Sequence, residues 1–300
     1  MFFKTKNFLN LYQEFLQYEL KDPQMDVNLL SQYQLVINIA DTGIVFFIND
    51  VASNKCLAIE KYKFSSPATT ENLTMNLQNI WASHPYLNAG YWKRVVLLFS
   101  NLKFSYVPKE YIKGDINPEI FSRLNFKLDK GESLAHMRLD ELSTYCYYAV
   151  NDELMQWFGE FYPSMITKTA HSTTAFLYGL LTYDKKASHI HVNISDALIT
   201  IANIKEGRLM YVNSFPFTSP DDVLYLCTLV ADELKLDTKD IKLNVWGDIT
   251  TDSDYFTKLK PYFLQVTPGK RPEFLKFSFN FDELEDQFHF DLFNAAKLYI

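Results

Sequence analysis

The amino-acid sequence predicts an α/β protein with two lobes, each built in the order β-β-β-α-β. Three observations predict this fold class: a pentapeptide that occurs twice, the same order of elements after each copy, and a Ser/Thr-Ser-Pro ending to both third strands. The pentapeptide reads Ile-Asn-Ile-Ala-Asp at residues 37–41 and Val-Asn-Ile-Ser-Asp at residues 192–196. Self-similarity that extends from residues to element order indicates an internal duplication.

Each pentapeptide starts a hairpin. The second strands are expected at 44–48 and 199–204, and polar turns at 53–55 and 205–207 follow them, as hairpins require. The third strands are expected at 57–64 and 209–217, and the fourth at 95–99 and 243–246. The helix between them can be capped by Thr69 or Thr70 in the first copy and by Ser219 in the second, where Pro220 takes the favoured first helical position.

The segment between the copies predicts an inserted α+β part. Residues 102–107 extend the fourth strand, and an insertion at about 108–145 carries a short helix near 118–124. A strand at 145–150, a helix from Asn151, a strand at 165–170 and a helix at 173–181 then lead to the second copy. We therefore expect a first lobe over 1–183 and a second lobe over 184–300, with helices at 252–263 and 290–298.

Composition excludes several classes of protein. The 300 residues are 48% hydrophobic, which suffices for buried cores. A net charge of −7 argues against nucleic-acid binding, which needs clustered Lys and Arg. No apolar run is long enough for a membrane span, and the acidic residues that follow the N-terminal lysines do not fit a signal peptide. Three scattered cysteines indicate buried free thiols, and we expect a cytoplasmic protein.

Two β-β-β-α-β units in one chain resemble the duplicated ribonuclease-H-like lobes of the actin-like ATPase superfamily. The order of elements from Val150 into His191-Val-Asn-Ile-Ser195 resembles the branch of pilus-assembly and type II secretion machines. The runs Asp41-Thr-Gly-Ile-Val-Phe-Phe-Ile-Asn-Asp50 and Asn54-Lys-Cys-Leu-Ala-Ile-Glu-Lys-Tyr62 resemble a family of uncharacterised bacterial proteins assigned this fold. The resemblance extends over about residues 31 to 298.

The resemblance implies a degenerate nucleotide site. Active relatives carry an aspartate on the first strand of each lobe, and these positions map to Asn38 and Asn193. An amide has no charge with which to hold Mg²⁺ and cannot act as a base. Of the glycines that approach phosphate and adenosine in the superfamily, Gly43 and Gly247 remain. The chain has 9 glycines, against about 21 at average usage.

Asp41 and Asp196 leave an alternative open. They stand three residues after the asparagines, at the expected hairpin tips, and can face each other across the cleft between the lobes. Aspartate is also a common turn residue that bonds its own backbone, which is the simpler interpretation.

Three other sets of residues have both a functional and a structural interpretation. His189 and His191 share a strand face with Asn193, but no third zinc ligand is placed beside them. Residues 270–279 combine Lys and Arg with Phe, which fits a small anionic contact or, more simply, an edge strand with solvated lysines. The acidic tract from Phe281 to Phe288 fits a solvated face or a docking segment.

The favoured function is a non-catalytic scaffold that binds an unidentified partner protein and holds no cofactor. The alternative is a divergent Mg-ATP-dependent ATPase or kinase that uses Asp41 and Asp196. A nuclease of ribonuclease-H type would need carboxylates on the first strands, where Asn38 and Asn193 stand.

Overall fold

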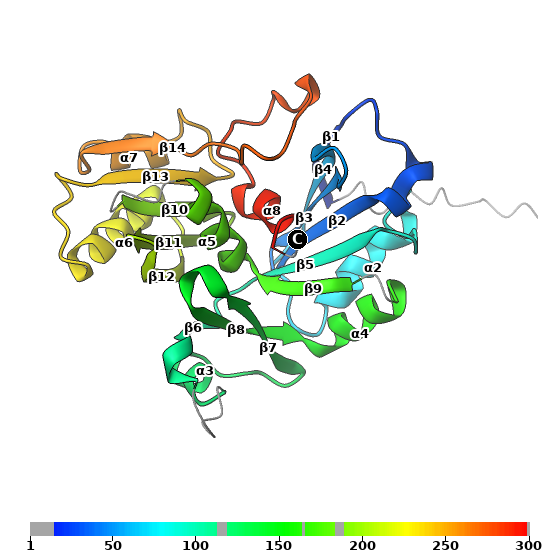
Figure 1. Cartoon of the computed structure of the whole chain (residues 1–300), viewed down its shortest axis with the longest axis horizontal. Helices are drawn as coiled ribbons and strands as arrows, with labels where there is room; N and C mark the ends of the chain where they lie inside the picture. The colour runs from blue at the N-terminus through cyan, green and yellow to red at the C-terminus, as the bar shows by residue number, and fades with distance from the viewer. Residues whose placement is uncertain (1–14, 113–118, 164–165, 184–188, 299–300) are drawn as a thin grey trace, which may run out of the picture.

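Figure 1 presents the computed structural model of the chain, which describes residues 15–112, 119–163, 166–183 and 189–298. Two large mixed sheets stand on either side of a pair of helices, and a smaller sheet lies beside them. No helix among the described residues is long and apolar enough to cross a bilayer.

The first sheet has the strand order β1-β4-β3-β2-β5-β9. Its strands are β1 (Leu16–Lys21), β2 (Tyr33–Ala40), β3 (Gly43–Asp50), β4 (Lys55–Lys63), β5 (Arg94–Ser100) and β9 (Ile166–His171). Strands β2 and β3 are antiparallel, whereas β5 runs parallel to β2. Side chains alternate between the two faces of the sheet. Ile37 packs in one cluster with Leu77 of helix α2 (Leu73–Ser83), and Val36 packs in another with Leu292 of helix α8 (Phe290–Ala295).

The second sheet has the order β12-β11-β10-β13-β14. Its strands are β10 (His189–Ser195), β11 (Leu198–Lys205), β12 (Arg208–Pro216), β13 (Lys242–Gly247) and β14 (Gln265–Pro268). Helices α6 (Pro220–Glu233) and α7 (Asp254–Leu259) pack on it in one hydrophobic cluster. The order β12-β11-β10-β13 repeats β4-β3-β2-β5 of the first sheet, with the same antiparallel and parallel pairings. The predicted β-β-β-α-β order is confirmed in both lobes.

The inserted part forms a sheet of its own, with the order β6-β8-β7. Its elements are β6 (Phe104–Pro108), α3 (Glu119–Asn125), β7 (Glu132–Leu139) and β8 (Thr144–Asn151). The prediction that residues 102–107 extend the fourth strand was wrong. The side chain of Asn101 accepts a hydrogen bond from the Lys103 amide at 2.8 Å, which turns the chain after β5. Strand β7 was missed because its exposed face is polar, so the sequence looked irregular.

Two of the predicted helix caps are present, and the predicted threonine cap of α2 is not. Ser219 caps α6 in a capping box and Pro220 begins the helix, as predicted. Asn151 caps α4 (Asp152–Phe161) through the amide of Leu154. Helix α2 begins after Asn72, and neither predicted threonine is its N-cap. The side-chain oxygen of Asn72 accepts a hydrogen bond from the Thr69 amide.

The segment that follows β14 differs from its prediction. Residues 270–279 form no edge strand and join the first sheet only through a bridge between Lys55 and Lys276. Phe281 is fully buried, so the tract from Phe281 to Phe288 is anchored in the core instead of presenting both rings for docking. Cys56, Cys146 and Cys227 are buried and free, as expected.

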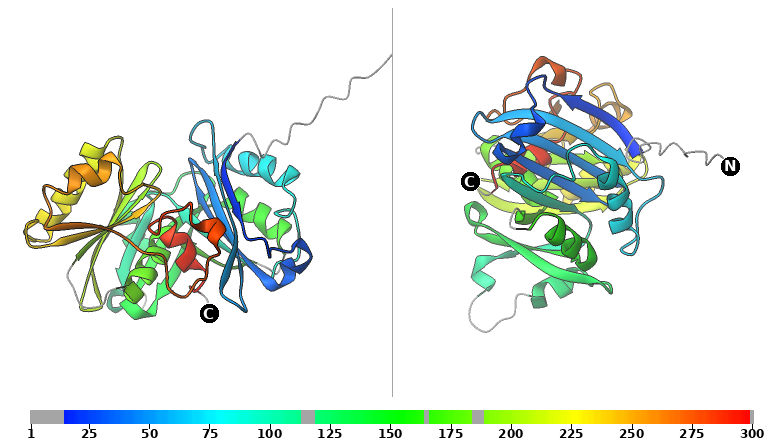
Figure 2. Two further views of the ribbon diagram at one scale, coloured as in Figure 1. Left: turned by 90° about the horizontal axis from the view of Figure 1, so that it is seen from above. Right: turned by 90° about the vertical axis from the view of Figure 1, so that its right-hand side faces the viewer.

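Helices α5 (Ser172–Tyr183) and α8 lie between the two large sheets (Figure 2). They approach closely at Gly179, where a Cβ atom would lie 2.5 Å from both Asn294 and Phe290. Helix α8 packs on the first sheet through Phe293 and Phe47, with ring centroids 5.2 Å apart, and on Trp246 of the second sheet through Phe290, at 4.8 Å. The lobes therefore share this helix pair. The division at 183/184 stays a prediction, because residues 184–188 lie outside the described part.

Candidate functional site

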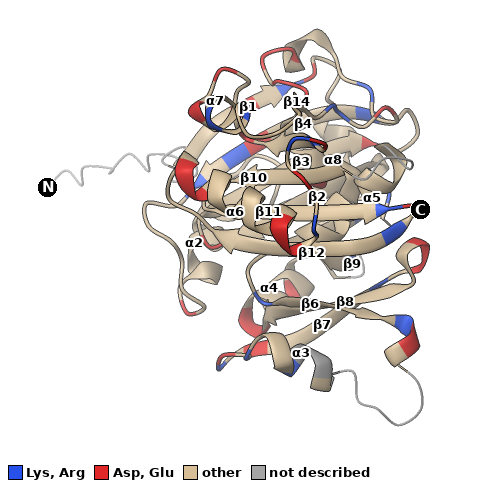
Figure 3. Cartoon of the chain, turned by 90° about the vertical axis from the view of Figure 1, so that its left-hand side faces the viewer, with Lys and Arg blue, Asp and Glu red and all other residues tan. Residues whose placement is uncertain are grey.

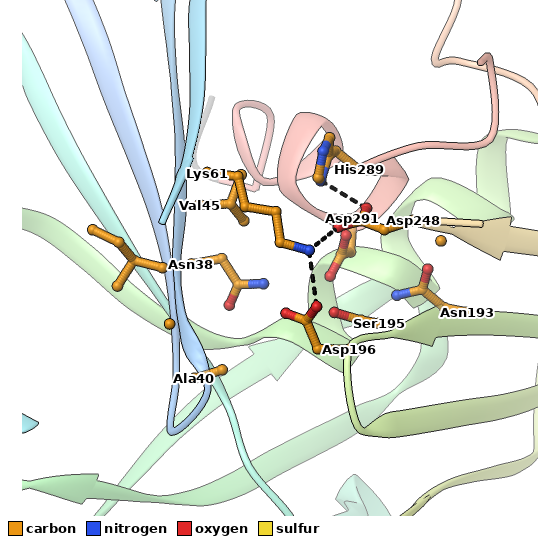
Figure 4. A pocket seen from close by; sticks show the side chains of 13 residues that line it. Asn38, Ala40, Val45, Lys61, Asn193, Ser195, Asp196, Asp248, His289 and Asp291 are labelled. Atoms are coloured by element: carbon orange, nitrogen blue, oxygen red, sulfur yellow. Dashed lines mark hydrogen bonds and ion pairs between the residues drawn. The ribbon is translucent and has the colours of Figure 1, made fainter. Parts of the chain in front are cut away.

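The hairpins of the two lobes bring the predicted asparagines into one cleft. Asn38 on β2 and Asn193 on β10 both line a cavity between the lobes (Figure 4). Both side chains are buried, at 8% and 7% exposure. The volume of the cavity is about 20 Å³, hardly more than one water molecule needs.

Lys61 of β4 closes this cavity by joining the lobes. Its Nζ lies 3.0 Å from Oδ1 of Asp196, at the tip of the β10–β11 hairpin. The same Nζ lies 2.5 Å from Oδ2 of Asp248, which follows β13. Figure 4 shows the lysine reaching from the first lobe to both carboxylates of the second. One cation thus bridges two anions across the cleft.

The charges of these three groups stabilise one another. Burial acts to lower the pKa of Lys61, but the carboxylates of Asp248 and Asp196 outweigh it and raise the pKa above its ordinary value. Burial acts to raise the pKa of Asp248, but His289 and Lys61 outweigh it and hold that pKa below its usual range. Both groups are therefore ionised at neutral pH, as an ion pair requires.

A second set of contacts extends the bridge to α8 and β1. His289, which precedes α8, has Nδ1 3.2 Å from Oδ1 of Asp248, and its Nε2 contacts the hydroxyl of Tyr18 on β1. Burial lowers the pKa of His289, although Asp248 opposes the shift. A neutral ring that donates from Nδ1 and accepts at Nε2 satisfies both partners. The network therefore runs from Lys61 of the first lobe to Asp248 of the second, and through His289 back to Tyr18 of the first sheet.

The two remaining glycines allow backbones to meet. A Cβ atom at Gly247 would lie 1.8 Å from the carbonyl oxygen of Ile194, and one at Gly43 would lie 2.1 Å from that of Tyr62. The Gly247 amide donates to the Gln287 carbonyl at 3.0 Å, and the Asp248 amide donates to the Ile194 carbonyl at 3.1 Å. These two amides are bonded within the protein and do not form a phosphate cradle.

The other polar groups of the cleft are unequally satisfied. The Oδ1 of Asn38 accepts from the Ser100 hydroxyl at 2.8 Å, whereas the buried Oδ1 of Asn193 has no partner in the described part of the chain. Burial, with the charge of Asp248, raises the pKa of Asp291 to about 6, although the neighbouring Asn193 side chain acts to lower it. The cleft therefore keeps one buried oxygen without a partner, that of Asn193, and one carboxyl whose ionisation burial disfavours, that of Asp291.

Asp41 and Asp196 lie at their hairpin tips as predicted. Asp41 lines a neighbouring cavity of about 30 Å³, and burial together with the charge of Asp196 raises its pKa. The negative charges of Asp41 and Asp196 therefore repel each other across the cleft. The Asp41 carbonyl accepts from the Ala68 amide at 2.6 Å, so its turn also has a structural role.

Sequence reasoning missed Lys61, Asp248, His289 and Asp291. Lys61 carried one signal, a lysine inside an otherwise buried strand. His289 and Asp291 gave none, because α8 reaches the cleft only through tertiary packing. His189 and His191 lie 6.3 Å apart between ring centroids, and His191 packs near Trp246. Among the described residues no group of three His, Cys, Asp or Glu side chains is arranged to hold a metal.

Replacing Lys61 tests the bridge. In Lys61→Met, Asp196 and Asp248 face each other without a cation, so we expect the free energy of unfolding in urea to fall by about 2 kcal/mol, less than for a fully buried pair. Lys63→Met, an exposed lysine on the same face of β4, is the matched control and should change it by less than about 0.5 kcal/mol. Equal effects of the two variants would contradict the bridge.

Asp291 gives a pH signature. Its pKa in the folded protein is about 6, above the ordinary 3.8, so its contribution to stability is full below pH 3.8 and is lost as pH rises toward 6. The Asp291→Asn variant has no carboxyl group to ionise at this position, so it does not lose this stability as the pH rises. Urea unfolding should show the stability of the variant relative to the natural protein rising by about 3 kcal/mol between pH 3.5 and 7. Asp282→Asn, an exposed control, should show a constant offset, and the same constant offset for Asp291→Asn would refute this assignment.

Comparison with known proteins agrees with this architecture. The family model described as "Protein of unknown function (DUF3822)" matches residues 22–266. No curated protein matches the chain in sequence. A Bacteroides thetaiotaomicron protein with an actin-like ATPase fold and unknown function is 18% identical, with a TM-score of 0.72 over 82% of this chain and 94% of that one. PilM, in a PilM–PilN type IV pilus biogenesis complex, is 11% identical, with a TM-score of 0.57 over 89% and 98%. The chain has the predicted actin-like ATPase fold and belongs to the DUF3822 family.

Proposed function

We propose that this protein is a non-catalytic scaffold of actin-like fold that binds a partner protein, and that its interlobe cleft is a degenerate nucleotide site. The observation that carries the proposal is the position of Lys61, bonded to Asp196 and Asp248 between the lobes. Under the proposal, this cation of the protein's own takes the place that magnesium and phosphate would need in an active relative.

The cleft residues do not fit a magnesium nucleotide as they are arranged. Asn38 and Asn193 are neutral, and Asp196 and Asp248 are already paired with Lys61. A nucleotide would have to displace Lys61 from both carboxylates and enlarge a cavity of about 20 Å³. The free energy that this displacement costs would make the net free energy of nucleotide binding less favourable.

Two observations support a protein partner over other kinds. PilM, which shares the fold, occurs in a complex with PilN, so this fold can act through protein contacts. In Figure 3, Lys and Arg are scattered among Asp and Glu on the ribbon and form no basic band in this view, and the chain carries a net charge of −7. Nucleic acid would need such a band. Under the proposal the protein works in the cytoplasm without a cofactor.

One observation favours the alternative, a divergent Mg-ATP-dependent ATPase or kinase. Four carboxylates, those of Asp41, Asp196, Asp248 and Asp291, surround the cleft and its neighbouring cavity. Carboxylates are the ligands that hard cations prefer. In that case Asp41 and Asp196 would hold the metal after Lys61 had withdrawn.

Thermal unfolding with Mg-ATP separates the two functions. A ligand that binds only the folded state at a hundredfold excess over Kd stabilises it by about 2.7 kcal/mol, which shifts the melting temperature by several degrees. We expect no shift for the natural protein with millimolar Mg-ATP. A shift that disappears in Asp41→Ala or Asp196→Ala, with Asp252→Ala as an exposed control, would establish the alternative instead.

A further inference from the structure

A larger cavity is lined by the C-terminal half of α5 and by residues along α8, whereas the cleft is lined by His289 and Asp291 at the start of α8. Its volume is about 770 Å³, within the range of ligand-binding pockets and far above that of the cleft. Tyr178 and Tyr183 of α5 line it together with Phe274 and Phe290. Its rim carries Lys270, Arg271, Lys297 and Glu273. Aromatic walls with an excess of positive charge are unexpected in a chain of net charge −7.

Two of the three cations form no ion pair with a described residue. Arg271 is engaged, because it donates to the carbonyls of Phe281 and Leu284 and its Nε lies 3.4 Å from Asp286. Lys270 and Lys297 form no ion pair with a described residue. The uncompensated charge of the rim therefore belongs to these two lysines.

The packing beneath the rim fixes where the lysines stand. Gly269 packs directly on Trp246, since a Cβ atom there would lie 2.0 Å from the indole. The indole nitrogen donates to the Lys270 carbonyl at 3.3 Å, which holds this backbone in place. The Nζ of Lys297 lies 4.0 Å from the centre of the Phe274 ring. A site that is ordered before binding loses less entropy when its ligand arrives.

A second cavity of about 500 Å³ adjoins the first at the same helix. Tyr178 and Thr182 line both, while Leu181 and Ile204 line only the second. The charge changes sign there, because Glu141 and Glu206 line its rim and form no ion pair with a described residue. We name the two cavities together the α5 groove. Lys270 and Lys297 line its first cavity, Glu141 and Glu206 line its second, and the Tyr178 ring lines both.

We propose that the α5 groove binds an extended segment of a partner protein, with acidic residues against Lys270 and Lys297, basic residues against Glu141 and Glu206, and an apolar side chain on Tyr178. The inference rests on the proposed scaffold function and names the surface that it uses. Opposite charges at the two ends select the direction of the segment, and the aromatic rings supply the buried area. A single small anion would leave the acidic end and half of the groove unused.

Fluorescence anisotropy with a labelled peptide tests the proposal. The probe is Asp-Glu-Ser-Phe-Ser-Lys-Lys, and its uncharged counterpart is Asn-Gln-Ser-Phe-Ser-Gln-Gln. We expect saturable binding of the probe, with a Kd about fivefold to tenfold lower than that of the counterpart, as two to four partly exposed ion pairs provide. Equal affinities of the two peptides, or no binding at millimolar protein, would overturn the proposal.

Variants locate the binding. The pairs Lys270→Gln/Lys297→Gln and Glu141→Gln/Glu206→Gln should each raise the Kd for the probe by about threefold or more. Lys242→Gln, an exposed lysine on β13 outside the groove, should not change it. Unfolding curves that match the natural protein establish that the variants are folded. An unchanged Kd in both paired variants would exclude the groove.

Two further arms separate this inference from its alternatives. Phenylacetate carries the same ring and carboxylate as a free metabolite, and its binding to Lys270 and Lys297 without peptide binding would replace the proposed segment with a small anion. A Mg-ATP shift together with groove-dependent peptide binding would refute the degenerate cleft and keep the groove. Absence of both would refute the groove and leave the cleft as proposed.

Discussion

The arrangement of the lobes depends on one ammonium group held between two carboxylates. Lys61 reaches from the first lobe to Asp196 and Asp248 of the second, and His289 ties Asp248 to the start of α8. Two anions this close would repel without the cation, and the lysine would be costly to bury without them. The charged form of each group is therefore stabilised by the charges of the others. The side chain of Lys61 closes the cleft.

The cleft and the larger cavity have opposite character. In the cleft, glycine permits backbone contact, amides bond to carbonyls, and Lys61 pairs with Asp196 and Asp248, which leaves about 20 Å³. The larger cavity, of about 770 Å³, keeps two lysines without ion pairs to described residues. The cation of the cleft is thus neutralised within the protein, whereas the two lysines of the larger cavity are not.

The repeat could be read from sequence because a duplicated order of strands leaves the same turn residues and prolines twice. Asn38 and Asn193 were located for the same reason, since each is counted from a strand that recurs. Lys61 was not recognised, because its partners come from the other lobe and no local pattern announces them. The strand predicted at 270–279 is absent for a related reason. Arg271 donates to the carbonyl of Phe281, and Phe281 packs in one cluster with residues of α8. These tertiary contacts override a strand-like alternation in the sequence.

The distance between the lobes tests the central claim most directly. Spin labels at Glu71→Cys and Asp232→Cys stand on exposed positions of the two lobes, and the natural cysteines are buried and will not react. Pulsed electron resonance should give one narrow distance distribution that Mg-ATP leaves unchanged and that Lys61→Met broadens. A distribution that narrows or shifts with Mg-ATP in the natural protein, or one that Lys61→Met does not alter, would contradict a cleft closed by Lys61.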